Sequence, residues 1–135
     1  MKFSFSTKGW HNYSFDDFCA IAKDLKFDGI ELHNINNKLF TDKDGAFHDY
    51  TAAATARRLY EKKLRIPCID VLCDIGAASK ADAAMEEFSK CINIASNLNI
   101  PAIRVKAEKA VDSDTARQNA IAFINKALPI ATAKN

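Results

Sequence analysis

The feature that most constrains this sequence is a fourfold alternation of short β-prone runs with longer runs of helical periodicity. The β-prone runs cover residues 3–7, 30–33, 68–73 and 102–106, and the helical runs cover 14–26, 51–64, 82–98 and 113–128. No two β-prone runs are joined by the short turn of a β-hairpin. This alternation predicts parallel strands that are connected by right-handed helical crossovers.

Within each predicted strand, apolar and polar residues alternate with a period of two. The apolar set is expected to contact the helices and consists of Phe3, Phe5, Ile30, Leu32, Ile69, Val71, Ile103 and Val105. The polar set is expected to face away from the helices and includes Ser4, Ser6, Glu31, Asp70 and Arg104. A doubly wound sheet would bury these charges under helices at several kcal/mol each, roughly, unless they were paired.

A sheet with helices on one face and charges on the other is typical of the wall of a (β/α) barrel. A complete barrel usually needs about 250 residues and eight units, whereas this chain has 135 residues and four units. We therefore predict an α/β fold, a single domain over residues 1–135, with four parallel βα units forming half of a (β/α)8 TIM barrel.

Composition and charge exclude several classes of protein. The net charge of +2 is too small to indicate nucleic acid or an anionic membrane as a partner. The N-terminus lacks an apolar signal region, and no apolar run approaches the ~18 residues that cross a bilayer. Cys19, Cys68, Cys73 and Cys91 show no CxxC or zinc spacing, so we expect reduced core cysteines in a cytoplasmic protein.

Local signals place the helix ends and one long connection. Ser14 is expected to be an N-cap, and the helix that starts after Ser113 is expected to falter at Pro129. The helix over residues 51–64 is expected to bury a side formed by Ala52, Ala56, Leu59 and Tyr60. Residues 34–49 are polar and lack periodicity, so they are predicted to be a long loop.

Chemistry-bearing side chains fall at the carboxyl ends of the strands, where barrel sites are built. His33 shares a strand face with Glu31 and has the chemistry to bind a hydroxyl group, or else to be a hydrogen-bonded edge residue. Arg104 and Lys106 suit a phosphate or carboxylate, although Arg104 has Glu31 and Asp70 as internal partners. The first βα loop carries Trp10, which would either stack on a sugar or cover the core.

Two helix-to-strand joins carry a family resemblance. The opening MKFSFST, the join LKFDGIELH at residues 25–33 and the join LNIPAIRV at residues 98–105 resemble the sugar phosphate isomerase/epimerase family. Its members are xylose isomerase-like TIM barrels, which also resemble endonuclease IV. The resemblance extends over essentially the whole chain, but only over the N-terminal half of the family fold.

The resemblance implies an enzymatic activity for a full-length barrel, but it implies no catalytic activity for this chain alone. Family members hold a divalent metal (Mn, Mg or Zn) with residues of strands five to eight, and move a proton on a ketose or related polyol. None of those strands is present here, so we expect no metal ligands, no cofactor and no catalytic residues in this chain. The endonuclease branch has histidines at positions where this chain has Cys73-Asp74 and Lys106-Ala107, which makes DNA repair an unsuitable function.

The family also places a pocket-lining glutamate after Gly-Ile, so Glu31 becomes a substrate-wall residue or, alternatively, a structural ion-pair partner of Arg104. The candidate substrate-binding residues are Glu31, His33, Arg104, Lys106 and Trp10. The expected partner is a small sugar or sugar phosphate, and the expected assembly is a homodimer or a union with a missing C-terminal half. Two alternatives stay open: a half-barrel binding or scaffold protein that dimerises, and a flavodoxin-like ligand-binding module.

Overall fold

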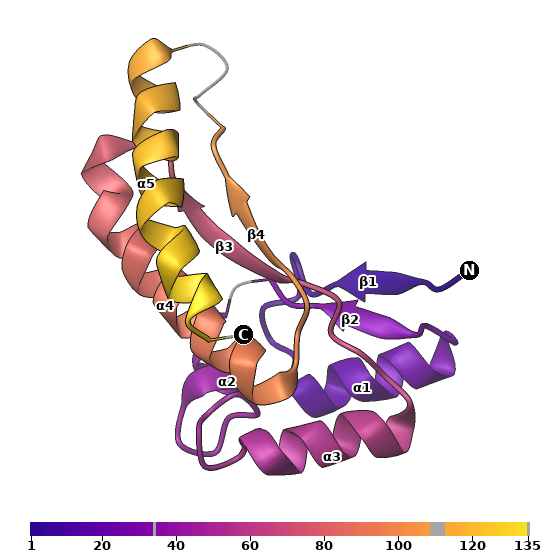
Figure 1. Cartoon of the computed structure of the whole chain (residues 1–135). Helices are drawn as coiled ribbons and strands as arrows, with labels where there is room; N and C mark the ends of the chain where they lie inside the picture. The colour runs from indigo at the N-terminus through magenta and orange to yellow at the C-terminus, as the bar shows by residue number, and fades with distance from the viewer. Residues whose placement is uncertain (34, 109–112, 135) are drawn as a thin grey trace.

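A computed structural model describes residues 1–33, 35–108 and 113–134, and it contains four strands and their intervening helices. The strands are β1 (Ser4–Ser6), β2 (Gly29–Glu31), β3 (Ile69–Asp74) and β4 (Ile103–Lys106). The helices are α1 (Phe15–Asp24), α2 (Lys38–Thr41), α3 (Ala52–Lys62), the 3-10 turn η1 (Ala78–Lys80), α4 (Ala81–Leu98) and α5 (Asp114–Thr132). The order confirms the predicted succession of four parallel βα units (Figure 1).

The strands follow one another in chain order across an open, parallel arrangement. β1 pairs with β2, placing Phe5 opposite Ile30, and β3 pairs with β4, placing Asp70 opposite Arg104. A parallel bridge between Leu32 and Ile69 links the two pairs. The Asp70 N–H donates to the Leu32 carbonyl over 2.8 Å, which continues the ladder from β2 to β3.

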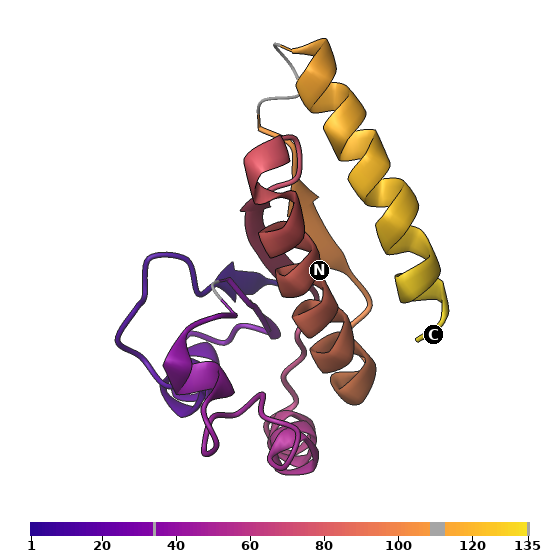
Figure 2. The ribbon, with the colours of Figure 1, turned by 90° about the vertical axis from the view of Figure 1, so that its left-hand side faces the viewer.

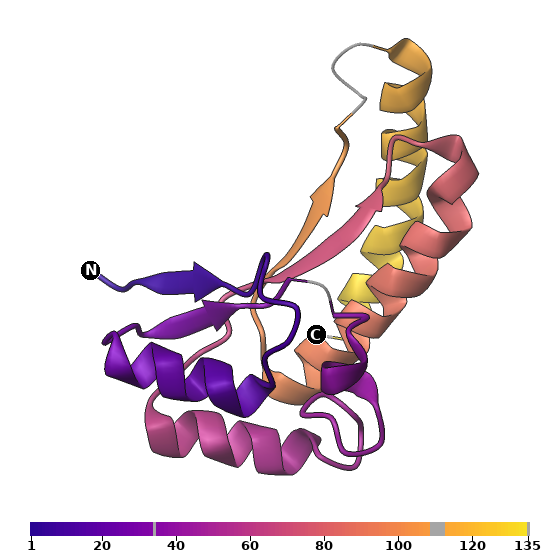
Figure 3. The same cartoon turned by 180° about the vertical axis from the view of Figure 1, so that it is seen from behind.

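The helices lie along one side of the strands and leave the other side bare, as Figures 1 and 3 show from opposite directions. Figure 2 shows α5 at one end of the molecule, with α4 between it and the helices α1 and α3. The apolar strand residues point to the helix side, where Ile30, Leu32, Ile69 and Val71 are fully buried. Because the charged strand residues are not covered by helices, the barrel-type interpretation holds and the flavodoxin-like one does not.

Phe3 is an exception to the predicted strand faces. Its side chain is 59% exposed, although the two-residue period places it on the same side as Phe5. Phe3 precedes the first paired residue of β1, and among the described residues β1 has a neighbouring strand, β2, on one side only. No helix therefore covers the Phe3 ring.

Three local predictions are also corrected. Residues 35–47 are not an open loop, because Ile35, Phe40 and Phe47 are buried and α2 forms within the segment. Of the predicted buried side of α3, Leu59 is buried, but Ala56 is exposed and Tyr60 is 85% exposed, because the helix turns Thr55 inward with Leu59. Pro129 lies inside α5, whose last turn continues because the Pro129 carbonyl still accepts the Ala133 N–H over 3.1 Å.

The start of α1 is fixed by the predicted cap. Ser14 Oγ accepts the Asp17 N–H, and Asp17 Oδ2 accepts the Ser14 N–H over 2.8 Å, which makes a capping box. No helix within the described residues is long and apolar enough to cross a membrane.

We expect Ser14→Ala to lower the free energy of unfolding by about 1 kcal/mol, because it removes one acceptor of the first helical turn. Chemical denaturation followed by circular dichroism measures the change. Ser79→Ala is the matched control, since Ser79 is exposed and a substitution there should change stability by less than about 0.5 kcal/mol. Equal effects of the two substitutions would contradict the cap.

Candidate functional site

Asp70, the second residue of β3, is the centre of a cluster of polar side chains on the helix-free face. Its carboxylate is fully buried and accepts two hydrogen bonds from Arg104, one from Nε and one from Nη2. The ring of His33 lies 2.8 Å away through Nδ1, and Lys106 Nζ lies 3.9 Å from Oδ2. Three of the predicted site residues, His33, Arg104 and Lys106, are thus brought together around Asp70, and the internal pairing of Arg104 with Asp70 that the sequence offers as an alternative is present.

The strand register explains this cluster. Asp70 stands directly opposite Arg104 in the parallel ladder, so both side chains emerge on the same face. An arginine fork matches a carboxylate with two parallel N–H bonds, and such charge-assisted pairs are the strong ones. Half of the Arg104 side chain, 51%, stays exposed beyond this pair.

His33 follows β2 and is held by Thr7, which follows β1. The His33 N–H donates to Thr7 Oγ1 over 2.8 Å, and the Thr7 hydroxyl donates to the His33 carbonyl over 2.9 Å. In the tautomer that donates Nδ1–H to the Asp70 carboxylate, Nε2 carries the lone pair. The two hydrogen bonds with Thr7 and the contact with Asp70 together fix the position of this imidazole.

Glu31 is paired with Arg104. Its Oε1 lies 2.7 Å from Arg104 Nη2, which is an ion pair across β3. This oxygen is buried, and within the described residues its contact with Arg104 is ionic and lacks hydrogen-bond geometry, because Nε and Nη2 of Arg104 donate to Asp70. The expected ion pair is present, and 22% of the Glu31 side chain stays exposed.

The charges of the cluster stabilise one another. Burial acts to raise the pKa of Asp70, but hydrogen bonds from Arg104 and His33 and the positive charges of Arg104 and Lys106 outweigh it. The pKa of Asp70 therefore lies below its ordinary value. The hydrogen bond to Asp70 raises the pKa of Arg104 in turn, so both groups are ionised near neutral pH.

Glu87 is a buried acidic residue that the sequence analysis did not single out. Projecting from α4, its carboxylate accepts the N–H groups of Leu72 and Cys73, each over 3.1 Å, where the β3–β4 register shifts. The signal was present in the sequence, because Glu87 lies on the same helical stripe as the buried Ala84 and Cys91. Glu87 thus binds the backbone of β3 from the helix side of the sheet, two and three residues after Asp70.

Trp10 lies in the first βα loop and belongs to an aromatic cluster. Its ring packs against Phe5, Tyr13 and Phe18, with centroids 5.2 to 6.4 Å apart. Within the described part of the chain, no hydrogen bond or ion pair joins Trp10 to Asp70 or its partners. These contacts match the alternative in which Trp10 covers the core.

The described residues do not fit a divalent metal. In residues 1–33, 35–108 and 113–134, no three His, Cys, Asp or Glu side chains converge on one point. The carboxylates of Glu31 and Asp70 face the guanidinium of Arg104, and a cation would have to displace that charge. No step of chemistry is therefore assigned to a metal in this chain.

The cysteines offer no activated nucleophile. Burial raises the pKa of Cys19 to about 11 and that of Cys91 to about 12, so both stay protonated thiols at neutral pH. All four cysteines are free thiols that form no disulfide with one another. Cys19 and Cys91 pack in the core as small apolar residues, as predicted.

Comparison with known proteins assigns the fold. Two solved structures superpose on the chain: the probable 3-DHS dehydratase AsbF of Bacillus anthracis, involved in petrobactin synthesis, and a xylose isomerase domain protein of Planctomyces limnophilus. The first has a TM-score of 0.72 and 22% identity over 100% of this chain, and the second has 0.66 and 13% over 97%. At these identities the likeness concerns the fold alone.

The chain spans half the length of each of these structures, so its four units correspond to half of a TIM barrel. No curated protein matches the sequence. The model of one family, the xylose isomerase-like TIM barrels, matches residues 19–135. This chain belongs to the xylose isomerase-like TIM barrel family, and it resembles the N-terminal half of those proteins.

Proposed function

We propose that the helix-free face of β2–β4 is one wall of a binding site for a small polyhydroxylated anion, such as a sugar phosphate. The observation that carries the proposal is Arg104, half exposed and fixed by Asp70, with the partly exposed carboxylate of Glu31 beside it. Because Asp70 holds the guanidinium in place, little conformational freedom is lost when an anion binds to it.

Each group of the cluster has a separate part in recognition. The exposed N–H groups of Arg104 suit the oxygens of a phosphate or carboxylate, and the Lys106 ammonium adds positive charge next to them. The partly exposed Glu31 carboxylate accepts a ligand hydroxyl, and His33 Nε2 accepts another. Asp70 makes no ligand contact in this scheme, because its two oxygens are used to orient Arg104 and His33.

The isolated chain is proposed to bind without catalysing isomerisation or epimerisation. Proton transfer next to a carbonyl needs an acid or base at the reacting carbon and a group that stabilises the developing oxyanion. In the described residues, the carboxylates that face the ligand are already compensated by Arg104. The family's chemistry would require the other half of the barrel.

The test is an isothermal titration of the chain with fructose 6-phosphate, with fructose and inorganic phosphate as separate probes. We expect weak binding of the sugar phosphate that Arg104→Gln reduces by roughly tenfold or more, because a charged hydrogen bond contributes about 1.5–3 kcal/mol. Glu31→Gln should weaken the sugar phosphate and leave inorganic phosphate unchanged, since its oxygen accepts a hydroxyl.

Arg57→Gln is the matched control, because Arg57 is an exposed arginine on α3 that pairs only within its own helix turn. It should bind all three probes like the unaltered chain. The proposal fails if none of the probes binds, or if Arg104→Gln and Arg57→Gln bind with the same affinity.

A further inference from the structure

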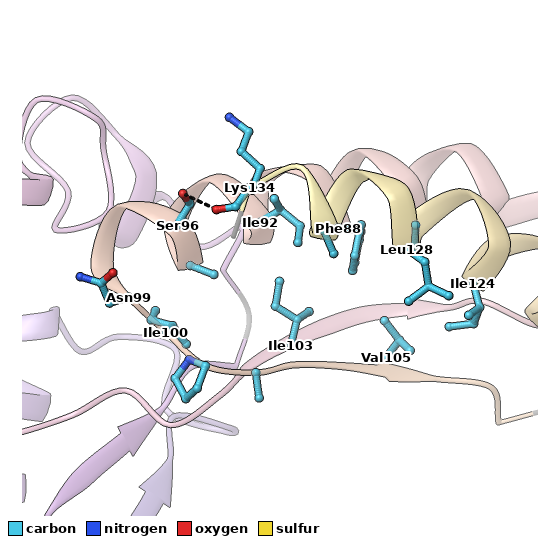
Figure 4. Close-up of a pocket in the computed structure, with 15 residues that line it drawn as sticks. Phe88, Ile92, Ser96, Asn99, Ile100, Ile103, Val105, Ile124, Leu128 and Lys134 are labelled. Carbon is cyan, nitrogen blue, oxygen red and sulfur yellow. Dashed lines mark hydrogen bonds between the residues drawn. The ribbon is translucent and has the colours of Figure 1, made fainter.

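An apolar groove lies on the helix side of β4, beneath α5. Its volume is about 620 Å³, and it runs between α4, α5 and the strand. In Figure 4, Ile124 and Leu128 of α5 point toward Ile103 and Val105 of β4, with Phe88 of α4 between the helices. Leu128 is 57% exposed, because the groove beneath it is not filled.

The groove opens next to an unused strand edge. β4 pairs with β3 on one side, and in the described residues no strand pairs with its other edge. The same holds for β1, which pairs only with β2. An edge with free N–H and C=O groups is a template for another strand, and the apolar groove adds side-chain burial to that pairing.

The edge at β1 carries the complementary feature. Phe3 is 59% exposed and shares the helix side of its strand with Phe5. If β1 of one molecule extended the sheet next to β4 of another, Phe3 would lie on the same side as the groove. The Phe3 ring and the groove are thus complementary. Both are apolar, and both lie on the helix side of the sheet.

We propose that two copies of this chain associate through these two edges, β1 of each copy pairing in parallel with β4 of the other. This β1–β4 contact, here called the joint, occurs twice around a two-fold axis. The dimer is therefore closed and leaves no strand edge unpaired. The chain spans half of the barrels it superposes on, and a second copy supplies the four βα units that complete eight. Phe3 of each copy enters the groove under Leu128 of the other.

Sedimentation equilibrium from low micromolar to several hundred micromolar concentration tests the pair. We expect a species of twice 14.9 kDa that dissociates on dilution. Phe3→Lys and Leu128→Asp should each shift the dissociation constant upward by roughly a hundredfold or more, because each places a charge in both joints. Tyr60→Lys, at an exposed position of α3, is the control that should leave association unchanged.

Mixing the Phe3→Lys and Leu128→Asp variants distinguishes this joint from any other contact. In a mixed pair, the introduced lysine of one copy meets the introduced aspartate of the other in one joint, and the second joint keeps Phe3 and Leu128. The mixture should therefore associate more tightly than either variant alone. A monomer at every concentration overturns the proposal and leaves the groove to a segment of a longer chain, and a dimer that ignores Phe3 and Leu128 overturns it as well.

Discussion

Phe18→Ala should lower the free energy of unfolding by about 3–5 kcal/mol, which is a large share of the 5–15 kcal/mol typical of a domain. Phe18 is fully buried where α1 meets β1 and α2, and the centroid of its ring lies 6.1 to 6.3 Å from those of Phe5, Trp10 and Phe40. Removing it leaves a cavity that the surrounding elements cannot fill. Chemical denaturation at one fixed protein concentration measures the loss.

Tyr60→Ala is the control for Phe18→Ala. Helical periodicity predicts Tyr60 on the buried side of its helix, whereas the structure leaves the ring 85% exposed. We expect this substitution to change stability by less than about 0.5 kcal/mol, because alanine also suits a helix. A loss for Tyr60→Ala that equals the loss for Phe18→Ala would contradict the packing described here.

Asp70→Asn should have the second largest effect, a loss of about 2–3 kcal/mol at neutral pH. The substitution keeps the shape of the side chain and removes the charge that Arg104 and His33 are bonded to. The half exposure of Arg104 keeps the loss at this level, since water solvates part of the freed guanidinium. Glu61→Gln is the control, because its ion pair with Arg57 is exposed and should contribute less than about 1 kcal/mol.

The Asp70 effect should also depend on pH. The pKa of Asp70 is lowered in the folded chain from the ordinary value of 3.8, so its contribution to stability is complete above that value. The contribution is lost as the pH falls from 3.8 through the lower folded-state pKa, because the unfolded chain takes up the proton first. The stability difference between the unaltered chain and Asp70→Asn should shrink in that window, and a constant difference would contradict an ionised Asp70.

Much of this structure follows from periodicity in the sequence. The period of two in the strands is sufficient to separate Ile30 and Leu32 from Glu31, because one face of a covered sheet must be apolar. Ser14 followed by Asp17 marks the start of α1 through local hydrogen bonds alone. The four βα units and the open half barrel therefore need no tertiary information.

The parts that could not be predicted depend on contacts distant in sequence. Phe40 and Phe47 pack against each other and against α1 without any local period, so their segment has the sequence of a loop. The clamp of Thr7 on His33 joins positions 26 residues apart. The pairing of Asp70 with Arg104 is one of the alternatives that the sequence offers, but the contact of Asp70 with His33 depends on how β2 and β3 are aligned and could not be predicted.

The central claim is that charged residues of neighbouring βα units share the helix-free face and act as one network. A double-mutant cycle with Asp70→Asn, Arg104→Gln and the double variant tests it most directly through the free energy of unfolding. The account predicts a coupling energy of about 1.5 kcal/mol or more, because each single substitution removes the same pair. If the loss in the double variant equals the sum of the two single losses to within about 0.5 kcal/mol, the two side chains do not interact. That result would contradict the strand register, the shared face and the site built on it.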